Sequence, residues 1–242
     1  MNLSDKSLEE RKKLTKAFPV VIVGKPGCGK SASVEFLPED EKMRTIIFDM
    51  EDKGLPEDDE SAYYKVIKLI SIDTTSKPKD HGNVIYKTIE EIVPYFTKAM
   101  ASDKIDRILI DTFTAFVSEL ERHYVTVSNG FTVWNSYNQQ LHDFFRVVKS
   151  ETYTHAKFVY ILGHYKPSKD RKDPDAEKFM VVKGNAHYRL IEAHFNTVIE
   201  VDEFKFRADN TESFDSTRIK RSLSPYESKQ NSLAEFEETI TK

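Results

Sequence analysis

Residues 18–31 read FPVVIVGKPGCGKS, and this stretch decides the fold of the 242-residue chain. Its first six residues form an uninterrupted apolar run rich in β-branched side chains, which is typical of a strand buried on both faces of a parallel sheet. The next eight residues match the pattern G-x-x-x-x-G-K-[ST] at every fixed position. A helix is expected to follow through about Phe36. This strand–loop–helix order predicts a site for the phosphates of a nucleotide.

Each fixed residue of this loop has a physical reason. Glycines let the backbone curve around a phosphate with its N–H groups pointing inward, at torsion angles that a Cβ atom disfavours. We expect Lys30 to contact the β- and γ-phosphates of ATP, and Ser31 to bind Mg²⁺. The expected nucleotide-binding residues are Gly24, Lys25, Pro26, Gly27, Cys28, Gly29, Lys30, Ser31 and Ala32.

Asp111 is a candidate for a second ligand of the metal, besides Ser31. It directly follows the apolar residues 107–110, RILI. The carboxyl ends of strands are where open α/β sheets bind their ligands. Beside an intact phosphate loop, we interpret Asp111 as a ligand of Mg²⁺, directly or through water. The alternative is an aspartate that only caps the following helix.

The order of the segments distinguishes between classes of phosphate-loop protein. Two apolar segments, 44–48 and 64–70, lie in the sequence between the phosphate loop and Asp111. An inserted strand is typical of the class that carries a catalytic glutamate, and it argues against a small-molecule kinase. Glu51 stands just past the strand expected at 44–48, where a carboxylate can orient and deprotonate the attacking water. Asp49 is the competing candidate, and Glu51 as a solvated loop acid is the alternative.

A polar group also ends a further expected strand. Residues 157–162, KFVYIL, are followed by Gly163 and His164. A hydrogen-bonding side chain at this point can sense the γ-phosphate and pass its presence to the loop that follows. The alternative is a surface histidine at a strand end.

Elsewhere the sequence predicts helices over 87–100 and 134–149, from apolar spacings of three and four residues. Residues 195–201, 203–207 and 217–221 alternate between apolar and polar side chains and predict antiparallel strands. Strands alternating with helices before a β-rich end favour a mostly parallel sheet with an antiparallel extension.

The chain resembles RecA-type ATPases, most closely the minimal RecA-like ATPases of phages linked to single-strand annealing. The segments that carry the resemblance are, in order, GKPGCGKS, IIFDME, ILIDT, VYILGH and VKGNAHYRLIEAHFNTVIEV. The resemblance covers about residues 18–207. It implies an α/β fold, that of a P-loop NTPase with a RecA-like core: a mostly parallel sheet flanked by helices, plus antiparallel C-terminal strands. It also implies an ATPase in which Lys30, Glu51 and His164 are catalytic, with ATP and Mg²⁺ as cofactors.

The same resemblance implies partners. These are single-stranded DNA, a single-strand-binding protein and further copies of the chain in a homo-oligomer, in phage recombination or replication. Only about 17 residues precede the first strand, whereas RecA builds filaments with a longer module, so an annealing or loading role is expected. The DNA-binding residues would follow His164 and are Lys166, Lys169, Arg171, Lys172 and Lys183. Four acidic residues interleave with them, so a solvated loop of mixed charge is the alternative.

Composition sets the remaining limits. The net charge of −4 argues against a uniformly basic DNA binder, although a local basic stripe suffices to contact phosphates. Cys28 is the single cysteine, which excludes an intrachain disulfide. Apolar runs are far shorter than the roughly 20 residues of a membrane span, so we expect a cytoplasmic protein, in the host cytoplasm if phage-encoded. We expect a charged arm over 1–17 and a RecA-like ATPase domain over 18–242.

Two other functions remain open from the sequence. One is a nucleotide-dependent switch or assembly ATPase that does not bind DNA. The other is a P-loop kinase that passes the γ-phosphate to a small molecule.

Overall fold

The computed structural model describes residues 17–51, 64–69, 84–127, 132–149, 158–166, 179–180, 195–208, 219 and 223–241. Its strands are β1 (Phe18–Gly24), β2 (Thr45–Asp49), β3 (Lys65–Leu69), β4 (Val84–Lys87), β5 (Arg107–Asp111), β6 (Phe158–Lys166), β7 (Phe179–Met180), β8 (Val198–Asp202), β9 (Lys205–Ala208) and β10 (Tyr226–Glu227). Its helices are the 3₁₀ helix η2 (Ser31–Phe36) and the α-helices α2 (Glu39–Lys42), α3 (Ile89–Met100), α4 (Phe113–Val127), α5 (Thr132–Val148) and α6 (Leu233–Thr241).

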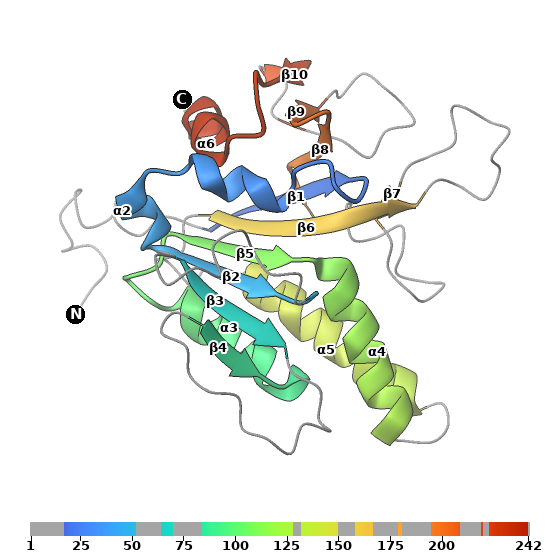
Figure 1. Cartoon of the computed structure of the whole chain (residues 1–242). Coiled ribbons are helices and arrows are strands. Elements are labelled where there is room, and N and C mark those ends of the chain that lie inside the picture. Colours follow the sequence, from blue (N-terminus) through green and yellow to red (C-terminus); the bar gives the residue numbers. More distant parts are fainter. Residues whose placement is uncertain are drawn as a thin grey trace, which may run out of the picture.

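One mixed sheet joins all the strands described (Figure 1). Its order is β10-β9-β8-β1-β6-β5-β2-β3-β4, and β7 pairs with β6 off this path. From β8 to β4 every neighbouring pair is parallel, whereas the β8–β9, β9–β10 and β6–β7 pairs are antiparallel. The expected fold class is therefore confirmed as an α/β fold whose mostly parallel sheet, flanked by helices, carries antiparallel strands at its C-terminal end.

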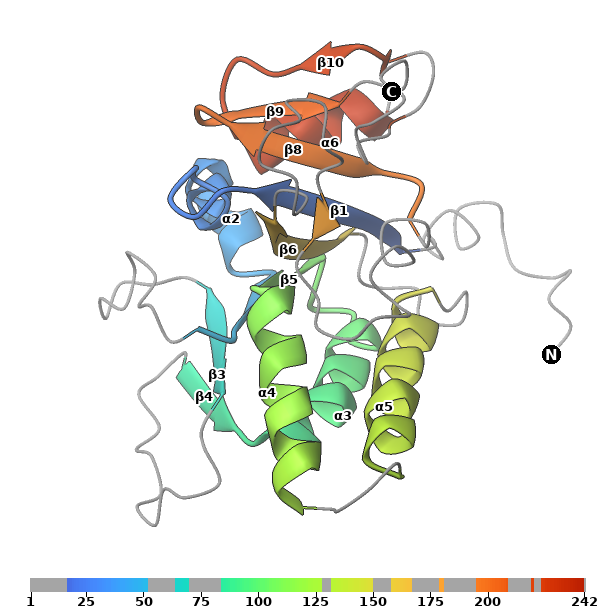
Figure 2. The same cartoon turned by 90° about the vertical axis from the view of Figure 1, so that its right-hand side faces the viewer.

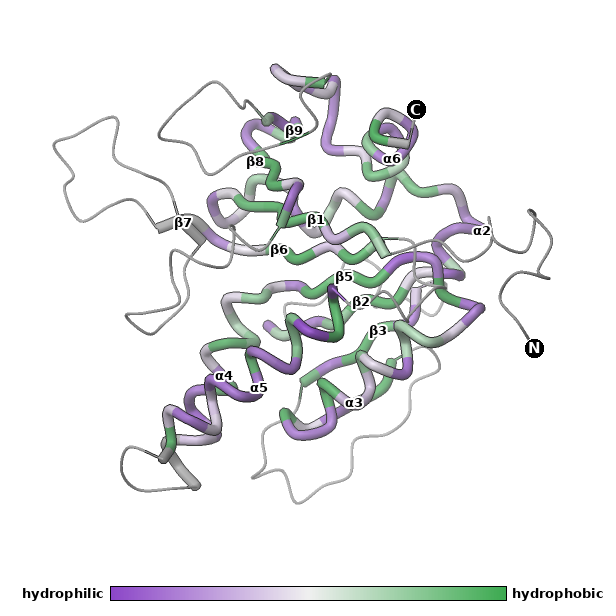
Figure 3. Tube along the Cα trace, turned by 180° about the vertical axis from the view of Figure 1, so that it is seen from behind, coloured by the Kyte–Doolittle hydropathy of each residue, from purple (hydrophilic) through white to green (hydrophobic). Residues whose placement is uncertain are grey.

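Helices cover both faces of this sheet, which explains the apolar runs. In β1, Val21 and Val23 pack into a core with α3, α4 and α5, while Val20 and Ile22 pack into a second core with η2 and α6. Figure 2 shows α3, α4 and α5 together on one face, and Figure 3 shows hydrophobic colour along the central strands. Because both faces are buried, the central strands carry apolar side chains without alternation. Within the described residues, no helix is long and apolar enough to cross a bilayer.

The structure corrects several expectations about individual elements. The segment predicted as an antiparallel strand at 195–201 contains β8, which pairs antiparallel with β9 as expected but runs parallel to β1 on its other edge. The strand predicted to end at Gly163 and His164 continues two residues further, to Lys166. The helix after the phosphate loop does end at Phe36, but it is of the 3₁₀ type. Of the strand predicted at 217–221, only Ile219 lies among the described residues, and residues 1–16 of the expected arm lie outside them.

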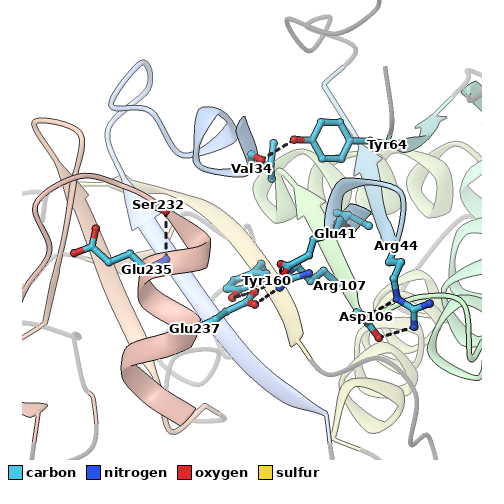
Figure 4. Close-up of polar contacts among 11 residues, drawn as sticks. Val34, Glu41, Arg44, Tyr64, Asp106, Arg107, Tyr160, Ser232, Glu235 and Glu237 are labelled. Carbon is cyan, nitrogen blue, oxygen red and sulfur yellow. Dashed lines mark hydrogen bonds and ion pairs between the residues drawn. The ribbon is translucent and has the colours of Figure 1, made fainter. Parts of the chain in front are cut away.

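The last helix, α6, is fixed to the sheet by a buried polar network (Figure 4). Arg107 of β5 donates to both carboxylate oxygens of Glu237, through Nε at 2.6 Å and through Nη2. The hydroxyl of Tyr160 donates to Glu237 Oε1 at 2.7 Å, and Arg107 also pairs with Glu41 of α2. Arg107, Glu237 and Tyr160 are all buried. This network joins α6 to two strands of the sheet and to α2.

Burial shapes the protonation of these groups. It raises the pKa of Glu237, and the hydrogen bonds from Arg107 only partly oppose this shift. Burial alone would lower the pKa of Arg107, but the hydrogen bond and charge of Glu237 outweigh it and raise that pKa, so the guanidinium group stays charged. The pKa of the fully buried Tyr160 hydroxyl lies well above its ordinary value, chiefly because burial disfavours the phenolate.

Candidate nucleotide-binding site

The parallel strands bring the predicted site residues to one edge of the sheet. In the register of β1 and β6, Gly24 lies beside His164, and in the register of β2 and β5, Asp49 lies beside Asp111. Since β6 lies between β1 and β5, the strand of His164 separates the phosphate loop from the strand of Asp111 (Figure 1). Carboxyl ends of parallel strands form the ligand-binding edge of such sheets.

The phosphate loop curves as its glycines require. Gly27 has a φ of +77° and Gly29 a φ of +95°, a region that side chains with a Cβ rarely adopt. Lys30 is buried, and its ammonium group donates to the carbonyl oxygens of Gly24 at 3.0 Å and Lys25 at 2.8 Å. A positive charge is thus held against a loop of the shape that accepts a phosphate.

The two predicted metal ligands contact each other. The hydroxyl of Ser31 donates to Asp111 Oδ2, across 80 positions of sequence. Mg²⁺ is bound by oxygen donors, commonly one or two carboxylates together with water and substrate phosphates. In the described part of the chain there is no group of three or more His, Cys, Asp or Glu side chains that could hold a metal alone. The donor pair therefore fits a magnesium ion shared with a phosphate.

Glu51 and His164 also meet. His164 Nε2 lies 3.2 Å from Glu51 Oε1, and the hydroxyl of Thr112 donates to the same oxygen at 2.8 Å. Both side chains are 16% exposed, so they border the solvent without being open to it. The backbone N–H of His164 donates to the hydroxyl of Thr114 at 3.2 Å. This cluster joins the ends of β2 and β6 to the start of α4.

Asp49, the competing candidate for a general base, lies in a different environment. It is the last residue of β2 and only 4% exposed, and its Oδ1 accepts the backbone N–H of Glu51 at 3.2 Å. This carboxylate shapes the turn that presents Glu51. The geometry therefore brings Glu51 to His164, while Asp49 supports the backbone turn that leads from β2 to Glu51.

The C-terminal segment supports the phosphate loop. The side chain of Asn231 is buried and donates through Nδ2 to the carbonyl oxygen of Gly29. The ring of Phe204 lies on the same residue, since a Cβ atom added to Gly29 would be 2.5 Å from Phe204 Cδ1. Thr112, Asn231 and Phe204 were not predicted from the sequence. Only Thr112 had a local signal, because its hydroxyl directly follows Asp111, the predicted metal ligand.

The predicted DNA-binding residues lie mostly outside the described residues. Lys166 is the last residue of β6 and is paired in register with Phe179 of β7. The other four, at positions 169, 171, 172 and 183, fall where the structure makes no description. The structure describes only the two strands that flank this segment: β6 and β7 pair antiparallel directly after His164.

Comparisons with known proteins add little to this geometry. No family model and no curated protein matches the sequence. Among solved structures, the chain is similar to the crystal structure of the RadB recombinase, with a TM-score of 0.42 and 9% sequence identity, over 77% of this chain and 75% of that one. A likeness this distant carries no functional argument. The function must therefore be argued from the site itself.

Proposed function

We propose that this protein is a magnesium-dependent ATPase of the RecA-like type that acts on single-stranded DNA, in an annealing or loading role during phage recombination or replication. One observation carries the ATPase part of the proposal. A carboxylate and an imidazole, Glu51 and His164, meet at 3.2 Å on the sheet edge that also holds Lys30 and the Ser31–Asp111 pair. A base, a polar sensor, a cation and two metal ligands are the groups that hydrolysis of a phosphoanhydride requires.

The roles follow from position. Lys30 offsets the negative charge of the β- and γ-phosphates, and Ser31 with Asp111 holds the metal. Bound Mg²⁺ would supply further charge stabilisation to the transferring phosphoryl group. Glu51 accepts a proton from the attacking water, and the hydroxyl of Thr112 orients its carboxylate.

His164 is positioned to report the state of the phosphates. It lies in register with Gly24, the first residue of the phosphate loop, and its ring contacts the proposed base. The strand that carries it runs two residues further, to Lys166, where it pairs with β7. We assign DNA binding to the lysine and arginine side chains of the mixed-charge segment between β6 and β7, so that nucleotide and DNA affinity are coupled through β6. Homo-oligomer formation and work beside a single-strand-binding protein belong to the same proposal and are supported by the sequence resemblance alone.

The deciding measurement is ATP turnover with and without single-stranded DNA. Stimulation by DNA supports the proposal. Slow turnover that DNA leaves unchanged favours the nucleotide-dependent switch or assembly protein. A requirement for a small phosphate acceptor favours the kinase, although the separation of β1 from β5 by β6 argues against it.

A charge-neutralising variant tests the DNA segment. Replacing Lys169, Arg171 and Lys172 together by glutamine should weaken DNA binding and reduce the slope of log affinity against log salt by about 2, because each phosphate contact on a single strand contributes about 0.7. The DNA site lies elsewhere if affinity and slope both stay unchanged.

A matched control removes three exposed charges on or near α3 and α5. The residues are Lys98, Lys104 and Arg146. This variant has the same change in net charge, so any loss that it shares with the test variant comes from net charge and not from a binding surface.

A further inference from the structure

An aromatic side chain stands beside the phosphate loop without a role in the chemistry above. Strand β8 is parallel to β1, with Val201 in register with Gly24, so β8 ends at the same edge as the phosphate loop. The next two residues, Glu203 and Phe204, form the turn into β9, since Asp202 and Lys205 are paired across it. Figure 2 shows this hairpin next to β1 and the loop that follows it.

The backbone of this turn is unfavourable for the residues that it carries. Glu203 has a φ of +47° and Phe204 a φ of +58°. Two-residue hairpin turns with both φ values positive strongly prefer Asn-Gly or similar pairs. A bulky residue in this region is a true outlier, and such strain concentrates at ligand-binding sites. Stability of the turn therefore does not explain why a phenylalanine stands here.

The ring of Phe204 is held in place yet faces solvent. It lies against Gly29, whose added Cβ would be 2.5 Å from Phe204 Cδ1 and 2.8 Å from Phe204 Cε1. The residue nevertheless keeps 56% of its surface exposed, among the largest exposures of any large hydrophobic residue in the described part of the chain. Asn231 fixes Gly29 through its carbonyl oxygen. An exposed aromatic surface is thus fixed against the loop that would hold the phosphates.

We propose that Phe204 forms the base subsite, stacking its ring on the base of the nucleoside triphosphate whose phosphates occupy residues 24–31. This inference rests on the proposed function, because it needs a nucleotide in the loop. Every base has a π-face, so stacking detects the presence of a base and discriminates weakly between bases. The subsite therefore adds affinity for a nucleotide over an inorganic triphosphate, and the phosphate loop supplies the rest.

The test compares ATP with inorganic tripolyphosphate, each with Mg²⁺, by calorimetric titration of the full chain. Phe204→Leu removes the aromatic face and should bind ATP about tenfold more weakly, as expected for loss of one base–aromatic stack. Its affinity for tripolyphosphate should stay unchanged. Phe204→Tyr keeps an aromatic face and should recover most of the ATP affinity.

A second variant separates binding from folding. Phe204→Gly suits the left-handed backbone, so its melting temperature should not fall, while its ATP affinity should fall as in Phe204→Leu. Trp134→Leu, at an aromatic residue that is 41% exposed on α5, is the matched control and should bind both ligands like the unchanged protein.

Three results would overturn the inference. The first is unchanged ATP affinity in Phe204→Leu and Phe204→Gly. The second is an equal loss for ATP and tripolyphosphate, which would mean that the ring shapes the loop and does not contact a base. If the unchanged protein binds neither ligand, the proposed function fails and this subsite fails with it.

Discussion

Glu237→Leu removes the acceptor at the centre of the buried network that fixes α6. In the folded protein, Glu237 accepts from Nε and Nη2 of Arg107 and from the hydroxyl of Tyr160. Leucine fills a similar volume but accepts no hydrogen bond. The variant therefore keeps the packing of the helix and leaves a buried guanidinium and a buried hydroxyl without their shared partner.

The magnitude follows from the burial of the pair. Removing one partner of a buried ion pair costs about 3–5 kcal/mol, because the other charge is left buried. Arg107 keeps its ion pair with Glu41, whose side chain is 36% exposed, so we take the low end of this range of costs. We expect the free energy of unfolding to fall by about 3 kcal/mol. For a chain of this size that corresponds to a drop in melting temperature of about 6–12 °C.

Urea denaturation and thermal melting measure the effect. Glu238→Leu makes the same change at the exposed neighbour in α6 and should alter the free energy of unfolding by less than about 0.5 kcal/mol. The triple variant Arg107→Met, Tyr160→Phe and Glu237→Leu replaces all three buried polar side chains of the network by apolar ones. It should recover most of the lost stability, because replacing a whole buried pair by apolar side chains is often neutral.

Two results would contradict this reasoning. If Glu237→Leu loses less than about 1 kcal/mol, the charge is not buried as described. If the triple variant is as unstable as Glu237→Leu alone, the loss comes from altered packing of α6 and not from an unpaired charge.

Two further predictions concern the site, and a third concerns the pH dependence of stability. Glu51→Gln should bind ATP normally and lose hydrolysis by about 10²–10⁴-fold in single-turnover assays, as for loss of a general base; if Asp49→Asn does this instead, the roles are exchanged. Ser31→Ala should raise the Mg²⁺ concentration needed for half-maximal ATP binding, measured by titration, because one oxygen donor is lost; an unchanged requirement would exclude the serine as a ligand. Burial raises the pKa of Tyr226 from 10.0 to about 12, so the unfolded chain ionises first and the free energy of unfolding should fall as the pH rises across that interval. Tyr226→Phe should flatten that decline in urea denaturation, and an equal decline in both proteins would refute the assignment.

Local sequence patterns predicted the centre of the sheet well. The apolar runs at β1, β2, β5 and β6 and the fixed motif of the phosphate loop are local signals, and each marked the right segment. Direction was predicted less well. The alternation in β8 was interpreted as a sign of antiparallel pairing, which is right for its neighbour β9 and wrong for its neighbour β1, because alternation reports which side chains are covered and not which way the neighbouring strand runs. A helix was expected to follow Asp111, but the bounds of α4, Phe113–Val127, were not predicted.

Some residues of the candidate site could likewise be predicted from local patterns, and others could not. Ser31 and Asp111 were predicted to meet because a motif and a strand end fix both positions, and the structure brings them into contact. Thr112, Asn231 and Phe204 acquire their positions only from tertiary packing. Asn231 lies 202 positions from the glycine that it contacts, and no periodicity or motif marks it. Long-range contacts of this kind are invisible in a single sequence.

The hydrogen bond between Asn231 and Gly29 has a kinetic consequence. It joins segments 202 positions apart, and the bond between Arg107 and Glu237 spans another 130. Contacts of such high contact order must close long loops, and they form late in folding. On refolding from urea, recovery of nucleotide binding should therefore lag behind recovery of far-ultraviolet circular dichroism, since helices form from local contacts whereas the site also needs the distant pairing of β1 with β6 and β8 and the contact from Asn231.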